Sequence, residues 1–145
     1  MFCYNRKMIT INFLAVAVAA LGSIVLGSLW YGPLFGKKWI SLMGWNSMTP
    51  EQMAEGKKTM MRSYIGTFIS SFVMAYVMSY VVAAFGSMDA VAGAFSGFWI
   101  WLGFVGTISL GNVLWDGKPM GLWLLNNGYN LLNLCYMGAL LAVWR

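Results

Sequence analysis

The sequence predicts an all-α integral membrane protein, with four transmembrane helices in a compact bundle and a short interfacial helix between the first two. Of its 145 residues, 60% are hydrophobic and only 9% are charged. Soluble domains usually carry about a quarter charged residues, so this chain could not cover a water-facing surface. Four apolar stretches are also long enough to cross a bilayer core of about 30 Å, which needs roughly 20 residues of helix. We expect residues 1–145 to form a single domain.

The predicted spans cover about residues 8–31, 60–85, 91–115 and 120–144. Several tryptophans lie at the ends of these spans, where indole rings favour the headgroup region. The first span has the basic start of a signal peptide, but its apolar run continues through Trp30 and is too long for the hydrophobic core of such a peptide. We therefore interpret it as a membrane anchor.

The segment between the first two spans predicts a helix that lies in the membrane interface. Its apolar residues recur at helical spacing, with lysines and a serine on the opposite side, which is typical of an interfacial helix. The apolar positions are Phe35, Trp39, Leu42 and Met43, and the polar positions are Lys37, Lys38 and Ser41.

A second helix start follows in the same loop. Thr49 is a good N-cap, Pro50 suits the first helical position, and Gln52 completes a capping box. We expect this helix to continue into the second span, with Gly56 as a position where it could break.

The distribution of Lys and Arg predicts the orientation in the membrane. Six basic residues lie on one side and three on the other, so loop 32–59 is expected in the cytoplasm and both termini outside. The six are Lys37, Lys38, Lys57, Lys58, Arg62 and Lys118, and the three are Arg6, Lys7 and Arg145. The net charge of +5 therefore indicates membrane orientation and lipid headgroups as partners, and no nucleic acid.

Small residues recur every four positions in the first three spans. Such stripes allow helix backbones to approach closely in lipid. They indicate packing within the bundle, or an interface in a homo-oligomer or with partner membrane subunits. The stripes are Ala15, Ala19, Ser23 and Gly27, then Ser71, Ala75, Ser79 and Ala83, then Gly93 and Gly97, and then Gly103, Thr107 and Gly111.

The polar residues of the spans gather toward the predicted cytoplasmic side, and they are most frequent in the fourth span. An amide that faces lipid would leave its donors and acceptors unsatisfied, so these side chains must face protein, ligand or water. These side chains either form hydrogen bonds between helices or line a polar pocket, with Trp30, Tyr31 and Trp115 around its opening. The candidate ligand-binding residues are Asn112, Asn126, Asn127, Asn130, Asn133, Tyr31, Tyr64 and Asp116. Asp116 is expected to form an interfacial ion pair with Lys118, or a gate with Lys37 or Lys38.

Catalysis and cofactors are not expected. The chain has no histidine, and its two cysteines, Cys3 and Cys135, lack the spacing of metal ligands. No Asp, Glu, Lys or Arg lies in the middle of a span, which disfavours a proton-driven pump. No nucleophile with a partner base is recognisable, so we predict no enzyme, no cofactor and no metal.

Three motifs resemble a known family. They are the run from Trp30 to Trp39, the run from Leu110 to Pro119, and the segment from Asn126 to Tyr129. In this order they are similar to the bacterial membrane family called domain of unknown function 1761, and the similarity covers about Met8 to Trp144. The resemblance implies a four-helix protein of the bacterial inner membrane, and it brings no activity and no site residues.

Two functions fit these observations. The first is a small protein that binds or transports a polar solute or lipid headgroup at the asparagine-rich face. The second is a structural or accessory subunit packed within a larger membrane complex.

Overall fold

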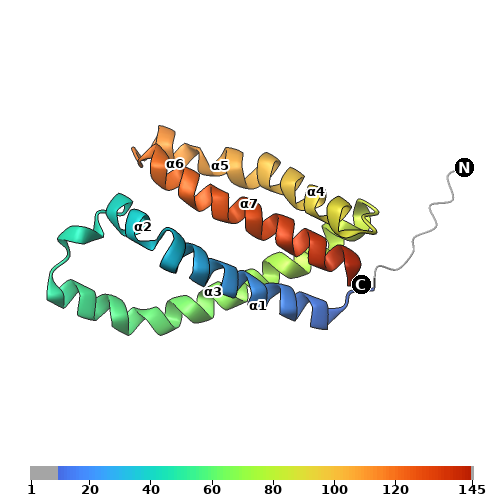
Figure 1. Cartoon of the computed structure of the whole chain (residues 1–145), viewed down its shortest axis with the longest axis horizontal. Coiled ribbons are helices and arrows are strands. Elements are labelled where there is room, and N and C mark those ends of the chain that lie inside the picture. The colour runs from blue at the N-terminus through green and yellow to red at the C-terminus, as the bar shows by residue number, and fades with distance from the viewer. Residues whose placement is uncertain (1–9, 145) are drawn as a thin grey trace, which may run out of the picture.

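The computed structural model describes residues 10–144, apart from the side chains at positions 53, 57 and 60. This part of the chain forms helices and turns, with no strand, and its four long helical segments run back and forth along one axis (Figure 1). The elements in chain order are α1 (Phe13–Leu29), the π-helical turn η1 (Trp30–Leu34), α2 (Gly36–Leu42), the 3-10 turn η2 (Trp45–Ser47), α3 (Pro50–Ala84), α4 (Ala90–Ile100), the π-helical segment η3 (Trp101–Gly106), α5 (Thr107–Ser109), α6 (Gly111–Leu114) and α7 (Met120–Val143).

Helix α1 begins later than the predicted first span. Asn12 is its N-cap, and the Asn12 Oδ1 accepts hydrogen bonds from the backbone N–H of Leu14 at 3.1 Å and of Ala15 at 3.2 Å. Positions 8 and 9 of the prediction lie outside the described residues. At its other end α1 continues into η1, where Phe35 N donates to Trp30 O at 2.9 Å. This wider turn lets Pro33, which has no N–H, lie within the helical path.

The loop between α1 and α3 contains a short helix, α2, at the position where a helix was predicted. Helix α2 presents Trp39 and Met43 toward the rest of the protein, while Lys37 and Lys38 are exposed. The Leu42 side chain packs next to Gly121 at the start of α7.

The predicted capping box opens α3. The Thr49 side chain accepts from Gln52 N at 3.3 Å, the Gln52 side chain accepts from Thr49 N at 3.0 Å, and Pro50 occupies the first turn. The helix continues without interruption through Gly56 for 35 residues. The loop helix and the second predicted span are therefore a single element.

The third predicted span, 91–115, corresponds to the helical stretch Ala90–Leu114, which is long and apolar enough to cross a membrane, but the stretch is not a regular α-helix throughout. It is divided into α4, η3, α5 and α6, with a turn at Leu110. Gly103, Gly106 and Gly111 fall in this divided part. Each glycine lowers α-helix stability by roughly 0.5–1 kcal/mol relative to alanine. This segment therefore departs from regular α-helix more easily than a segment without glycine would.

Helix α7 lies between the other long helices and contacts α1, α3 and α4. Its closest neighbour is α4, because glycines on both helices bring the backbones together. A Cβ on Gly93 would meet the carbonyl oxygen of Gly138, and a Cβ on Gly97 would meet that of Leu134. The predicted stripe in the third span thus serves contacts within the chain at these two positions.

The other predicted stripes are buried to different extents. Ala15, Ala19, Ser23, Ser71 and Ala75 are buried within the chain. In the stripe of Gly103, Thr107 and Gly111, by contrast, Gly103 and Thr107 are exposed. Most small residues therefore pack inside one molecule, and the oligomer remains a prediction.

The hydrophobic core lies toward one end of the molecule. It contains Ala19, Ala75, Met78 and Met137, which come from α1, α3 and α7. At the other end the first half of α3 diverges from α1 and α7 (Figure 1), and every described residue from 61 to 70 is exposed. The bundle is therefore packed at one end and open at the other, rather than compact throughout as predicted.

Among the described residues, three helical stretches are long and apolar enough to cross a membrane: Phe13–Leu34, Met61–Ala84 and Ala90–Leu114. This suggests a membrane protein. Helix α7 has 24 residues and is equally long, but its asparagines make it less apolar. Its central position explains this composition, because a helix surrounded by protein need not be apolar on every side.

Candidate functional site

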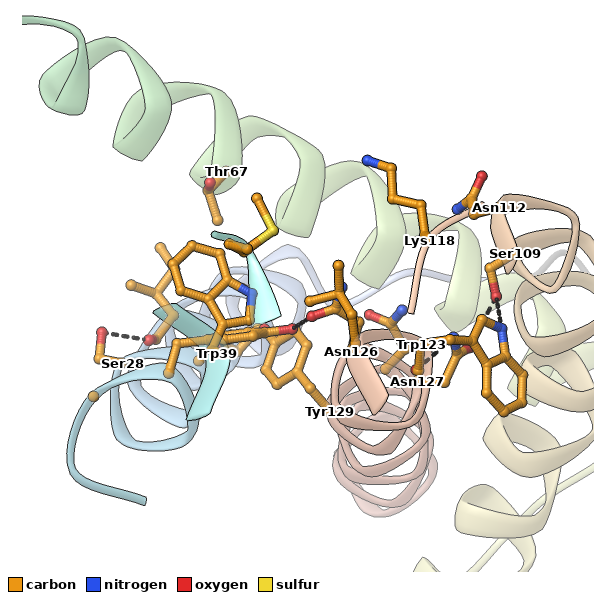
Figure 2. Close-up of a pocket in the computed structure, with 18 of the residues that line it drawn as sticks. Ser28, Trp39, Thr67, Ser109, Asn112, Lys118, Trp123, Asn126, Asn127 and Tyr129 are labelled. Atoms are coloured by element: carbon orange, nitrogen blue, oxygen red, sulfur yellow. Dashed lines mark hydrogen bonds between the residues drawn. The ribbon is translucent and has the colours of Figure 1, made fainter. Parts of the chain in front are cut away.

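A cavity of about 900 Å³ lies at the open end of the molecule (Figure 2). Its walls come from the second half of α1 and η1, from α2, from Tyr64 and Thr67 of α3, from the α5–α6 region, and from the first half of α7. This volume lies in the range of small-ligand sites, roughly 300–1,000 Å³. The cavity exists because α3 diverges where these other segments stay together.

Tyr31 and Asn126 join the η1 and α7 walls. The Tyr31 hydroxyl donates to Asn126 Oδ1 at 3.1 Å. The Tyr31 ring lies between two aromatic neighbours, with ring centroids 5.5 Å from Trp39 and 5.3 Å from Tyr129. Tyr129 is itself fixed, because its hydroxyl donates to Ser23 O at 3.0 Å. One wall of the cavity is therefore a rigid aromatic cluster that carries a hydrogen-bonded amide.

A second polar cluster joins α5 to α7. Trp123 Nε1 donates to Ser109 Oγ at 3.0 Å, and Ser109 Oγ donates to Asn127 Oδ1 at 3.1 Å. Asn127 Nδ2 donates to Trp123 O at 3.1 Å, so the hydrogen bonds form a closed set (Figure 2). These bonds hold the divided third segment against α7 at the edge of the cavity.

Three asparagines at the cavity wall have unused hydrogen-bonding groups. Within the described part of the chain, the side-chain amides of Asn112 and Asn130 have no hydrogen-bond partner, although both residues line the cavity. Asn126 uses its Oδ1, and its Nδ2 likewise has no partner among these residues. The cavity therefore presents amide donors and acceptors that are available to a bound molecule.

The structure gathers six of the eight predicted residues around this cavity. They are Asn112, Asn126, Asn127, Asn130, Tyr31 and Tyr64. Asn133 and Asp116 do not line it. Asn133 is buried, where its Oδ1 accepts from the Ser23 hydroxyl at 2.5 Å and its Nδ2 lies 3.8 Å from the sulfur of Met74. Asn133 therefore joins α7 to α1 by a hydrogen bond.

The carboxylate of Asp116 is exposed at the turn after α6, away from the cavity wall. Within the described residues it forms no ion pair with Lys118, Lys37 or Lys38, so neither predicted pair is present. The predicted opening also differs. Trp115 is 89% exposed, and Trp30 donates its Nε1 to Leu125 O at 3.1 Å, so Tyr31 alone of the three predicted aromatic residues lines the cavity.

Sequence reasoning missed several lining residues. Trp39, Ser109, Trp123, Tyr129 and Lys118 all line the cavity. A signal existed for Trp39, whose helical face was recognised as apolar but was assigned to the membrane interface. For Ser109 and Trp123 the signal was weak, because their contact depends on how the segment from α4 to α6 packs along α7.

The polar groups on the cavity wall are suited to hydrogen bonding with a ligand. These groups are amides, hydroxyls and one ammonium group, that of Lys118, and they lie among aromatic rings and aliphatic side chains such as those of Ile24 and Val113. In the described part of the chain, no three His, Cys, Asp or Glu side chains lie close enough together to hold a metal ion. Amides and hydroxyls both donate and accept hydrogen bonds, so such a wall can orient a polar group at a fixed position.

Comparison with known proteins gives a family but no relative of known activity. No curated protein and no solved structure matches the chain at a significant level. A family described as "Protein of unknown function (DUF1761)" matches residues 14–142, in agreement with the resemblance of the three sequence motifs. The chain belongs to this DUF1761 family.

Proposed function

We propose that the protein is a four-span membrane protein that binds a lipid headgroup or small polar solute in its cavity. Three apolar helices support membrane insertion. Helix α7 would be the fourth span: it has 24 residues, or about 36 Å of helix, and runs alongside α4 and α1. Its asparagines are tolerated because their side chains meet protein groups or the cavity rather than acyl chains.

The unpartnered amide of Asn130 carries this proposal. If the cavity were only a packing defect between helices, the asparagines on its wall would find partners in the protein, as Asn127 and Asn133 do. Leaving polar groups unpaired at membrane depth is costly. A molecule that hydrogen-bonds Asn130 and Asn112 would offset this cost and would be held there.

The charges near the cavity support its orientation. The described cations Lys37, Lys38, Lys58, Arg62 and Lys118 all lie on elements at the open end. By the positive-inside rule this end faces the cytoplasm, and both termini lie outside. A bacterial inner membrane fits this arrangement. The cavity would then exchange its ligand with the cytoplasmic leaflet or the cytoplasm.

The proposal is tested by changing Asn130 to Leu. The full chain is purified in mild detergent, and native mass spectrometry measures which lipids and small molecules remain bound. The substitution removes a lining amide that has no described protein partner, so the fold should persist while retention of the ligand falls. Fluorescence gives a second signal, since Trp39 and Trp123 line the cavity and should report a bound molecule.

Asn46→Leu is the matched control. Asn46 is exposed in η2 and does not line the cavity, so its replacement adds the same apolar group elsewhere. Retention by Asn46→Leu should equal that of the unchanged protein. The proposal fails if Asn130→Leu retains the same molecules in the same amounts, or if it loses its helical fold while Asn46→Leu keeps it.

A second function is favoured by one observation. Residues 61–70 of α3 are exposed on every side and include Met61, Ile65, Phe68 and Ile69. A partner membrane protein packed on this segment would make the chain an accessory subunit. Gentle solubilisation followed by mass measurement distinguishes a stoichiometric foreign partner from a monomer with bound lipid.

A further inference from the structure

We infer that the ligand is a net-anionic phosphate ester, and that Lys118 selects it by charge; this inference rests on the proposed function of the cavity. Lys118 is the only charged residue that lines the cavity among the described residues. Among the described residues no carboxylate lies on the wall, and the nearest along the chain, Asp116, is exposed and does not line it. Within the described part of the chain Lys118 has no ion-pair partner.

The position of Lys118 suits a counter-charge. It lies in the turn between α6 and α7, and its side chain extends along the cavity toward α3, on the side where Thr67 lies (Figure 2). Its backbone N–H donates to Asn112 O at 3.1 Å, which fixes the turn from which the side chain extends. An ammonium group without a protein partner attracts an anion, and it repels a ligand whose net charge is positive.

The neutral groups on the wall match phosphate oxygens. Phosphate offers acceptors in several directions, and the Nδ2 groups of Asn112, Asn126 and Asn130 are donors without a described partner. The wall lacks an acid that could receive an ethanolammonium or choline group. A zwitterionic headgroup would satisfy Lys118 with its phosphate, but its cation would meet only aromatic rings and no carboxylate on the wall.

The divergence of α3 favours a lipid as the source of the phosphate. Tyr64 and Thr67 form the α3 side of the cavity, and they belong to a segment that is exposed throughout. That segment lies within the apolar stretch Met61–Ala84, so the cavity opens sideways at membrane depth. A headgroup can occupy the polar cavity while its acyl chains remain in the bilayer beside α3. A free phosphate ester would use the same contacts without this opening.

The test measures charge selectivity in the full-length protein. The protein is placed in nanodiscs or detergent with equal amounts of phosphatidylglycerol and phosphatidylcholine, and bound lipid is counted by native mass spectrometry. We expect roughly a tenfold preference for phosphatidylglycerol, the size of one charge-assisted contact. Lys118→Gln should remove this preference while phosphatidylcholine is still retained. Lys38→Gln, which removes one exposed cation of α2 outside the cavity, should leave the preference unchanged.

Glycerol 3-phosphate, added as a competitor, identifies the source of the phosphate. Displacement of phosphatidylglycerol by millimolar glycerol phosphate supports a shared phosphate site. Binding of glycerol phosphate that depends on Lys118, without retention of either lipid, supports the phosphate chemistry with a soluble ester as its source. If the two lipids are retained equally and Lys118→Gln has no effect, the inference of charge selection is overturned. In that case the proposed function still holds if binding depends on Asn130. If binding also does not depend on Asn130, both the inference and the proposed function are overturned.

Discussion

The contact between α4 and α7 can be tested by adding a single methyl group. Gly97→Ala places a Cβ against the carbonyl group of Leu134 and 2.8 Å from the backbone nitrogen of Cys135. These are backbone atoms, so no side chain can rotate away to make room. The two helices must separate by roughly 1 Å to restore ordinary contact.

The expected cost follows from two opposing effects. Overpacking of a close contact costs about 1–3 kcal/mol, and the rigid backbone on both sides places Gly97→Ala toward the upper value. Alanine also stabilises helix by roughly 0.5–1 kcal/mol relative to glycine. We therefore expect the free energy of unfolding to fall by about 2 kcal/mol.

The measurement is an unfolding titration in detergent micelles, with helix content followed by circular dichroism. Gly66→Ala is the matched control, because Gly66 lies in α3 with no atom within 4 Å of its added Cβ. That variant should be unchanged or stabilised by roughly 0.5–1 kcal/mol. If Gly97→Ala is as stable as Gly66→Ala, the close approach of α4 and α7 described above is incorrect.

Three further substitutions test local features of the fold. Asn133→Leu removes the acceptor of the Ser23 hydroxyl and should lower the free energy of unfolding by about 1 kcal/mol in the same titration; an unchanged value would contradict the bond. Thr49→Ala removes the cap of α3, at a cost of about 1 kcal/mol, and should speed hydrogen exchange in the first turns around Gln52 but not in the apolar spans. Gly86→Ala forces alanine to adopt a φ of +66° in the turn between α3 and α4 and should cost about 1 kcal/mol, measured as a lower midpoint of thermal unfolding; an unchanged midpoint would show that the turn can relax.

The features that depend on neighbouring residues could be predicted from the sequence. The capping box at Thr49 and Gln52 is present as expected, because each partner lies within one helical turn of the other. Spacing by four residues likewise placed Ala15 and Ala19 on one buried face. These predictions hold because helix geometry alone determines which residues share a face.

The features that depend on distant segments could not be predicted in this way. Nothing in the composition of residues 61–70 shows that this part of α3 diverges, since the same apolar residues would serve for contact with helices or with lipid. The hydrogen bond between Ser109 and Trp123 likewise depends on how the glycine-rich segment from α4 to α6 packs along α7. The cavity follows from both of these, so its volume and three of its five aromatic lining residues (Trp39, Trp123 and Tyr129) were not predicted from the sequence.

The asparagines of α7 show how position along a helix decides the role of a residue. Asn126, Asn130 and Asn133 lie on one face of the helix, and their spacing alone does not distinguish their roles. At Asn133 the helices are closely packed, and the amide bonds Ser23 of α1. Ser23 also lines the cavity, so this bond lies where the packed end meets the open end. One turn nearer the open end, α3 has diverged and Asn130 has no such partner among the described residues. The same requirement for a hydrogen-bond partner therefore stabilises the fold at one position and creates a binding wall at the other.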